Sequence, residues 1–340
     1  MSPADFPTRT YSEALGTISN AQLQAALGHF DLGTLVAAEP AQTGLFARNI
    51  FLTASKGEFV LRGAPWDPRQ YGKEAFFSRL VHERTDVPAP WPYQIDLSTD
   101  IFGWAYAIMP RLPGIDVGNA DVRKAFNRDD RIALARAMGE ALAGLQDLTW
   151  PLYGDYDLDA GAIVPADTLF AEWTVARVRG QLDRCREASA ATTDDDVAYV
   201  ESIIDSARTA LAIEPEQPTF VFRDFKENNT VAERTEGGWR VTGVFDLGEG
   251  YFADGEVDFS RTLADYLRED ADLVRGFMQG YTAKRPLRPG SEQRFPLYMA
   301  LDRMIIWAYG QRNNLWFKPE TTLRDWLEPF TSFPIAEYMR

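Results

Sequence analysis

The N-terminal part of the chain alternates short apolar runs with polar turns, a pattern that predicts a small sheet. RNIFLTA and GEFVLRG are typical of strands, and the intervening SKG is typical of a turn. SNAQLQAALGHF predicts an amphipathic helix that is capped by Ser19 or Asn20. KEAFFSRLVHER returns to helical spacing, with Phe76 and Phe77 on one side, until the proline-rich VPAPWPY stops it. A further apolar strand, WAYAIMP, ends at Pro110.

After Gly114 the chain contains long segments in which apolar residues recur at helical spacing. DDRIALARAMGEALAGLQDL places apolar residues on one face at three- and four-residue steps, which predicts a buried helix. DTLFAEWTVARVRGQLDRC, DVAYVESIIDSARTALA and PLYMALDRMIIWAYGQRNNLW predict three more. We therefore expect an α+β protein with a small antiparallel-sheet lobe (1–109), a hinge (110–113) and a mainly helical lobe (114–340) interrupted by one β-hairpin. Nucleotide clefts commonly lie between two such lobes.

A dense polar cluster follows the short apolar run at the start of FVFRDFKENNTV. The segment NNTVAER and the later WRVTGVFDLGEG predict a hairpin around the turn TEGG. Centring that turn on Glu236–Gly237 pairs Val231 with Thr242. The same register places Asp246 just past Asn229, at the open end of the hairpin.

Three oxygen-bearing side chains are expected to converge at this open end, because Asp224 lies in the loop that enters it. Asn229 and Asp246 suit Mg²⁺, which takes few protein ligands and leaves positions for phosphate oxygens. Phosphoryl transfer to a hydroxyl also needs a carboxylate that receives the proton, and Asp224 is the candidate for this catalytic role. Each residue alone is an ordinary turn former or strand end, but the set at this spacing favours phosphotransfer.

FRDFKENN together with FDLGEG resembles the catalytic loop and the metal-binding loop of the protein-kinase-like fold. The run DLGEGYFADGEVDFSR is similar to the pattern of the aminoglycoside phosphotransferase family of small-molecule kinases, in which two acids precede an apolar helix. Asp254 and Asp258 fall on those two positions, and the resemblance implies a structural role for Asp258. It also implies that Asn229 and Asp246 are the metal ligands.

The resemblance extends into the N-terminal part of the chain. RNIFLTASKGEFVLRG resembles the family's first strands and implies that Arg62 is the phosphate-facing cation. KEAFFSRLVHERTDVPAPWPY resembles the helix whose glutamate, here Glu74, pairs with that cation. AIMPRLPG resembles the family's hinge, which implies that Met109, Arg111 and Leu112 contact the nucleotide. The implied cofactors are ATP or GTP, with Mg²⁺.

The chain departs from the family pattern at several positions. Phe222 replaces the usual histidine before the catalytic aspartate, and apolar packing can hold the same turn. Lys226 replaces a second histidine, and its ammonium is either a catalytic group that neutralises the transferring phosphoryl or a solvated loop lysine. Arg62 replaces the lysine of the wider fold, while Lys73, the other cation nearby, occupies a helix position that points elsewhere. The phosphate-covering loop PAQTGLFARNIF contains only one glycine, Gly44.

The composition of the chain excludes some classes of binding partner. The formal net charge of −15 argues against nucleic acid and permits a cationic acceptor. No apolar run is long enough to span a membrane, and MSPADFPTRTY lacks the features of a signal peptide, so we expect a cytoplasmic protein without membrane contact. A single cysteine, Cys185, cannot form an internal disulfide, and two histidines argue against a His/Cys metal site.

Two sets of residues are candidates for the acceptor pocket. Aromatic residues near the C-terminus either line it or, as helical spacing favours for most of them, pack in the core: Trp307, Tyr309, Trp316 and Phe317. Three acids after the metal loop are candidates to contact a cationic acceptor: Glu249, Asp254 and Glu256. A solvated loop position is the simpler interpretation of Glu256.

The favoured function is transfer of the γ-phosphate of ATP or GTP to a hydroxyl of a small molecule, either an aminoglycoside-like antibiotic or a hydroxylated metabolite. The alternative is a nucleotide-binding regulatory protein of the pseudokinase type, which Phe222 and the glycine-poor loop favour and the complete catalytic set opposes. A protein kinase ranks last, because no Ala-Pro-Glu element follows the metal loop. The pattern selects neither the acceptor nor an oligomeric state.

Overall fold

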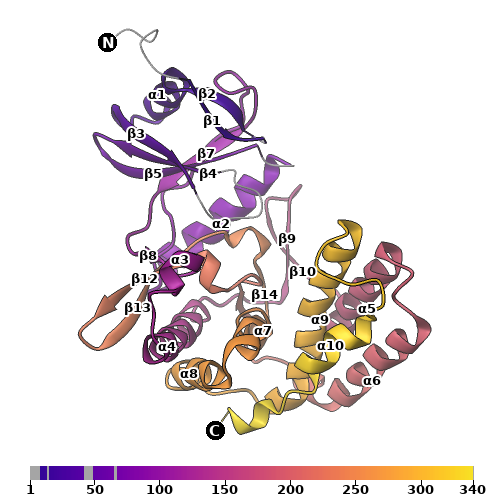
Figure 1. Ribbon diagram of the computed structural model, residues 1–340. Helices are drawn as coiled ribbons and strands as arrows, with labels where there is room; N and C mark the ends of the chain where they lie inside the picture. The colour runs from indigo at the N-terminus through magenta and orange to yellow at the C-terminus, as the bar shows by residue number, and fades with distance from the viewer. Residues whose placement is uncertain (1–7, 14, 42–48, 65–66, 340) are drawn as a thin grey trace.

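The computed structural model describes residues 8–13, 15–41, 49–64 and 67–339, which form two lobes (Figure 1). The N-terminal lobe contains a five-stranded antiparallel sheet in the order β3-β4-β5-β7-β6. Its strands are β3 (Leu35–Pro40), β4 (Asn49–Ala54), β5 (Gly57–Gly63), β6 (Gln94–Asp96) and β7 (Tyr106–Pro110). A hairpin and two helices complete the lobe: β1 (Thr8–Ser12), β2 (Gly16–Ser19), α1 (Asn20–His29) and α2 (Arg69–Arg84).

Different elements cover the two faces of the N-terminal sheet. Every second residue of β4 is buried, and this row, which includes Ile50, packs with Leu23 of α1. The opposite face carries Met109 of β7, which packs with Tyr71 of α2. As a result α2 lies between the sheet and the C-terminal lobe, where it contacts the 3-10 turn Leu247–Glu249 (Figure 1).

Helices dominate the C-terminal lobe, and they pack around two apolar clusters. Their bounds are α3 (Ala120–Arg123), α4 (Arg128–Leu145), α5 (Phe170–Ala188), α6 (Asp194–Leu211), α7 (Phe259–Glu269), α8 (Ala271–Thr282), α9 (Ser291–Arg312) and α10 (Leu323–Thr331). The first cluster joins α4, α7 and α8 to the buried side of the loop over residues 222–229, and the second joins α5, α6, α9 and α10. This loop therefore packs on helices of the C-terminal lobe.

Two small sheets carry the polar segments that the sequence singled out. One has the strand order β13-β12-β8 and the other β10-β9-β14-β11. Their strands are β8 (Ile115–Asp116), β9 (Gly154–Asp157), β10 (Ala162–Pro165), β11 (Thr219–Val221), β12 (Thr230–Thr235), β13 (Gly238–Val244) and β14 (Tyr251–Ala253). The expectation of one hairpin in this lobe was wrong, because β9 and β10 form a second. These two strands have only four residues each, which is too few for a periodic signal.

The register of the β12–β13 hairpin differs by one residue from the prediction at its open end. The predicted pairing holds from the turn as far as Ala232, which lies opposite Val241. A β-bulge follows, so Val231 lies opposite Gly243 and not opposite Thr242. The backbone N–H of Phe245 still donates to the carbonyl of Asn229 at 3.1 Å, which keeps Asp246 at the open end.

The predicted helices are present with altered limits. Ser19 caps α1 in a capping box, as one of the two expected caps. Helix α2 begins at Arg69, before the predicted start at Lys73. Of the helices that the structure describes, none combines the length and apolar character needed to cross a membrane.

Candidate active site

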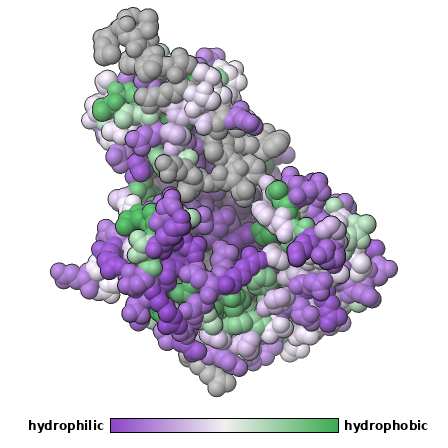
Figure 2. Space-filling view, viewed as in Figure 1, coloured by the Kyte–Doolittle hydropathy of each residue, from purple (hydrophilic) through white to green (hydrophobic). Residues whose placement is uncertain are grey.

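The surface is hollowed between the two lobes, and hydrophilic residues line much of the rim (Figure 2). The loop after β11 enters this region with Phe222 fully buried against Phe220 and Phe225. Arg223 follows in the left-handed region at φ 69°. This apolar packing holds the turn where the family pattern has a histidine.

Asp258 braces the backbone of this turn. Its carboxylate oxygens accept the backbone N–H of Phe222 at 2.7 Å and that of Arg223 at 2.6 Å. Burial raises the pKa of Asp258 to about 7, although the two hydrogen bonds oppose the rise. The side chain is 1% exposed and contacts the loop from below, which is the geometry of a structural residue.

Asp224 leaves this strained turn with its carboxylate surrounded by donors. Lys226 Nζ lies 2.8 and 3.0 Å from its two oxygens, and Asn229 Nδ2 lies 2.8 Å from Oδ2. Arg261 Nε lies 3.0 Å from Oδ1 and 3.2 Å from Oδ1 of Asp302. These contacts fix the orientation of a carboxylate whose side chain is still 21% exposed.

Lys226 is therefore bound to Asp224, and the interpretation of it as a solvated loop lysine was wrong. Sequence reasoning missed Arg261 altogether. It lies on α7, one turn after the structural Asp258, and its contact with Asp224 spans a distance in sequence that no local pattern reveals.

The second part of the site is an ion-pair chain that crosses from the N-terminal lobe. Arg62 Nη1 lies 3.0 Å from Glu74 Oε1, and Arg62 Nη2 lies 2.7 Å from Asp246 Oδ1. The structure thus brings together Arg62 and Glu74 as the resemblance implied, and it adds Asp246 to the pair. Lys73 is not in this chain, as its helix position predicted.

The pKa values of the two acids in this ion-pair chain shift in opposite directions. Burial raises the pKa of Glu74 to about 7, and Arg62 opposes the rise. Burial also acts to raise the pKa of Asp246, but the charge and hydrogen bond of Arg62 outweigh it and the pKa is lowered. Asp246 is therefore ionised at neutral pH. Its backbone, like that of Arg223, is left-handed, at φ 67°.

Asn229 and Asp246 fit a magnesium ion. The amide nitrogen of Asn229 donates to the backbone and the side chain of Asp224, which leaves the amide oxygen available as a ligand. Arg62 contacts Oδ1 of Asp246, and Oδ2 is available as a second ligand. Among the described residues, no group of three His, Cys, Asp or Glu side chains is arranged to bind a metal. Mg²⁺ in phosphotransfer sites needs only one or two protein ligands beside the phosphates.

A buried network below the loop holds Asn229 in place. Arg131 Nη1 donates to both oxygens of Glu227 at 2.8 and 2.9 Å, and the hydroxyl of Tyr266 donates to Glu227 at 2.9 Å. Burial raises the pKa of Glu227, and Arg131 opposes the rise. Glu227 opens the 3-10 turn that ends at Asn229, so this network fixes the turn that carries the proposed ligand.

The predicted hinge residues lie where the two lobes join. Met109 is buried in β7 opposite Val60. The backbone N–H of Arg111 donates to Glu58, and its guanidinium lies 4.1 Å from the ring centre of Phe51. Leu112 packs against Gly243 of the catalytic hairpin. Their role in nucleotide binding stays a prediction. Gly44 and most of the phosphate-covering loop lie outside the described residues.

The three acids that are candidates for acceptor binding differ in burial. Glu249 is exposed and pairs with Arg223 at 3.0 Å. Asp254 and Glu256 are buried and pair with Arg294, whose side chain is fully enclosed. The interpretation of Glu256 as a solvated acid was therefore wrong, and neither buried acid can contact an acceptor.

The candidate aromatic residues near the C-terminus also differ in burial. Trp307 is fully buried and packs with Phe317, as core residues do. Trp316 is 57% exposed and lies beside Tyr309 at a ring-centre distance of 5.6 Å, so it is not a core residue. None of the four is in a position that the described contacts link to Asp224.

This combination defines a class: a protein-kinase-like fold with a sheet lobe, a helical lobe and a phosphotransfer loop between them. The model of the phosphotransferase enzyme family matches residues 37–290. The chain belongs to this family, because the match covers well over half of its length and includes both halves of the site.

Similar proteins support the same class. Homoserine kinase of Burkholderia pseudomallei (strain 1710b) is 32% identical over 102 residues, which are 28% of this chain. The match spans only 30% of that relative's length. The GDP complex of wild-type aminoglycoside 2'-phosphotransferase-IIIa has a TM-score of 0.60 at 16% identity, with 92% of this chain and 97% of that chain covered. A thermostable mutant of aminoglycoside phosphotransferase APH(4)-Ia with AMP-PNP and hygromycin B has a TM-score of 0.59 at 16% identity, with 86% and 97% covered.

Proposed function

We propose that the protein transfers the γ-phosphoryl group of ATP or GTP to a hydroxyl of a small molecule in a magnesium-dependent reaction. The observation that carries this proposal is the position of Asp224. Its carboxylate is oriented by Lys226, Asn229 and Arg261 and stays partly exposed beside the ionised Asp246. A protein that only binds nucleotide has no need of this carboxylate.

The residues then take distinct roles. Asp224 accepts the proton of the acceptor hydroxyl as its oxygen forms the new bond to phosphorus, and the bond to the nucleoside diphosphate breaks. Arg62, held by Glu74, contacts the phosphates, and residues 109–112 contact the base. Asn229 and Asp246 would hold Mg²⁺, which when bound neutralises charge on the phosphates. Lys226 stabilises negative charge on the transferring group from its place beside Asp224.

We further propose that residues 1–109 bind the nucleotide, that residues 114–340 bind the acceptor, and that the protein acts in the cytoplasm. The named relatives phosphorylate or bind different acceptors, since one is a homoserine kinase and another was solved with hygromycin B. Membership in the family therefore does not identify the acceptor class, which has to be inferred from the residues of the site.

A thermal-shift titration with ATP and GTP, with and without Mg²⁺, tests the nucleotide part of the proposal. We expect metal-dependent stabilisation of about 2.7 kcal/mol when nucleotide is at about 100 times its Kd. Asp246→Asn should abolish the metal-dependent part. Asp100→Asn, which changes an exposed carboxylate in the N-terminal lobe, is the matched control and should leave it unchanged. Metal-independent binding by the wild-type protein would contradict the assigned role of Asp246.

A further inference from the structure

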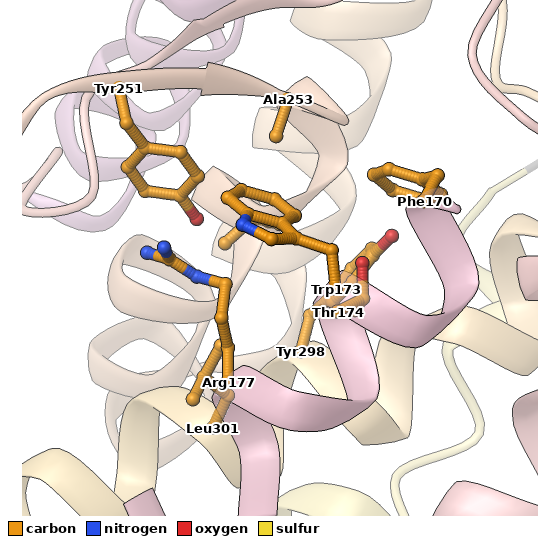
Figure 3. A pocket seen from close by; sticks show the side chains of 9 residues that line it. Phe170, Trp173, Thr174, Arg177, Tyr251, Ala253, Tyr298 and Leu301 are labelled. Atoms are coloured by element: carbon orange, nitrogen blue, oxygen red, sulfur yellow. The ribbon is translucent and has the colours of Figure 1, made fainter. Parts of the chain in front are cut away.

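A preorganised guanidinium lies in the C-terminal lobe next to the metal loop. Arg177 of α5 lies over two aromatic rings that meet edge-on, with its central carbon 4.5 Å from the ring centre of Trp173 and 4.4 Å from that of Tyr251 (Figure 3). Its Nη1 lies 2.6 Å from Asp155 of β9. Tyr251 begins β14 immediately after the turn that contains Glu249, so this guanidinium lies at the edge of the site.

A second guanidinium approaches from the catalytic loop. Arg223 directly precedes Asp224, and its Nη1 lies 3.0 Å from Glu249. The left-handed backbone of Arg223 turns its side chain away from the core, and the side chain is 30% exposed. Arg177 and Arg223 therefore each have one carboxylate partner and further donors that no described carboxylate occupies.

Lys73 of α2 faces these pairs from the N-terminal lobe. Helix α2 packs on the 3-10 turn Leu247–Glu249, and the position before Lys73 lies against Tyr156 of β9. Burial lowers the pKa of Lys73. The nearby charges of Glu249 and Asp155 oppose this shift, and those of Arg223 and Arg177 add to it. Among the described residues, Lys73 has no carboxylate within ion-pair distance. A partly buried ammonium without an anion is costly, so this position is suited to an anionic ligand.

The charges that act most strongly on Lys73, together with its own, leave a positive excess that favours an anionic ligand. Lys73, Arg177 and Arg223 supply three positive charges, and Asp155 and Glu249 supply two negative charges, which leaves 3 − 2 = one positive charge. This excess is local, because the whole chain has a net charge of −15. A group with a single negative charge balances the cluster, whereas a polycation is repelled by it.

We propose that the acceptor carries a carboxylate as well as a hydroxyl, and that Lys73 binds this carboxylate between Arg177 and Arg223 while the hydroxyl lies at Asp224. This inference rests on the proposed phosphotransfer, since it assigns the acceptor of that same site. It names an acceptor class other than the cationic one that the net charge of the chain permits. A carboxylate fits better than a phosphate monoester, because it has one negative charge and the cluster has one to balance.

Calorimetric titration of matched acceptors tests the inference directly. The probes are glycolate, lactate and homoserine, each against its own primary amide, which keeps the hydroxyl and removes the negative charge. The protein contains a bound, non-hydrolysable ATP analogue and Mg²⁺, and ionic strength is constant. We expect at least one acid to bind about tenfold or more tightly than its amide, as loss of a charge-assisted hydrogen bond predicts.

Variants test whether Lys73 is responsible for the tighter binding of the acid than of its amide. Lys73→Gln should remove the advantage of the acid over the amide, and Lys73→Arg should restore most of it. Arg79→Gln on the same helix removes an equal charge from an exposed position and should change nothing. If the acids bind no better than their amides, or if Lys73→Gln keeps the preference, the inference is wrong. Nucleotide binding in the same samples separates this outcome from failure of the proposed phosphotransfer, which loss of metal-dependent nucleotide binding would show.

Discussion

Two aspartates that lie close together in the sequence, Asp246 and Asp254, belong to ion-pair clusters with opposite environments. Asp246 pairs with Arg62 between the lobes and its side chain is 41% exposed. Asp254 is 1% exposed and is enclosed with Arg294, Tyr298 and Arg288. Both clusters pair an aspartate with arginine. The difference shows that a carboxylate serves chemistry only where part of it stays open to a ligand.

The enclosed cluster has all its oxygens engaged by protein. Arg294 Nη2 lies 2.7 Å from Glu256, and the backbone N–H of Arg288 donates to the same carboxylate at 2.7 Å. Burial raises the pKa of Glu256, and nearby Asp254 raises it further. We interpret this cluster as a structural link between the metal loop and α9, which carries Arg294.

The largest predicted effect is on catalysis at Asp224, beside the open cluster. Asp224→Asn keeps the shape of the side chain and removes the proton acceptor, so phosphotransfer should fall by about 10²–10⁴-fold. The melting temperature should change little, because the side chain is partly exposed. Steady-state assays with an active acceptor measure the rate, with Asp100→Asn as the control. A variant with normal turnover would show that Asp224 is not the proton acceptor.

The second effect is on stability at the enclosed cluster. Arg294→Met leaves Asp254 and Glu256 without their buried cation, and the free energy of unfolding should fall by about 3–5 kcal/mol. Arg288→Met, at the edge of the same cluster with 22% of its side chain exposed, should cost clearly less. Urea denaturation measures both. Equal losses would mean that enclosure does not distinguish the two arginines.

A third prediction concerns pH. The pKa of Glu74 in the folded protein is about 7, above its ordinary value of 4.5, so the folded state binds a proton more tightly than the unfolded state does. Stability from this group is therefore fully present below about pH 4.5 and is lost as pH rises towards 7, by at most about 3 kcal/mol. Asp258 has the same direction of shift.

Glu74→Gln separates the two contributions to this pH dependence. The substitution removes the titration of Glu74 and should flatten the curve of unfolding free energy between pH 4.5 and 7 relative to the wild type. Asp86→Asn, an exposed acid just after the same helix, should leave the curve unchanged. An identical slope in Glu74→Gln would place the titration elsewhere.

The smallest effect is expected at the exposed rim. Glu249→Gln breaks the pair with Arg223, in which the carboxylate is 61% exposed, and should change the unfolding free energy by less than about 1 kcal/mol. Chemical denaturation measures this value. A loss as large as that of Arg294→Met would show that exposure does not weaken the pair.

Local sequence determined the elements whose geometry repeats over a few residues. The helices over α4, α5, α6 and α9 were predicted from their periods, and the β12–β13 hairpin from its turn. Helix α8 was missed in part because Gly276 and Gly280 weaken helical propensity. Those glycines are needed because α8 packs closely on α4, where a Cβ at Gly280 would lie 2.0 Å from the carbonyl oxygen of Arg136.

The sequence by itself determined the spacing of Asp224, Asn229 and Asp246, since one loop and one hairpin fix it. Only the tertiary structure decided which other charges join them. Lys73, Arg177 and Arg261 come from three different helices, and packing of helices around the apolar core sets their positions. The physical reason is that backbone periodicity constrains neighbours along the chain, whereas the charge around a site depends on contacts between distant segments.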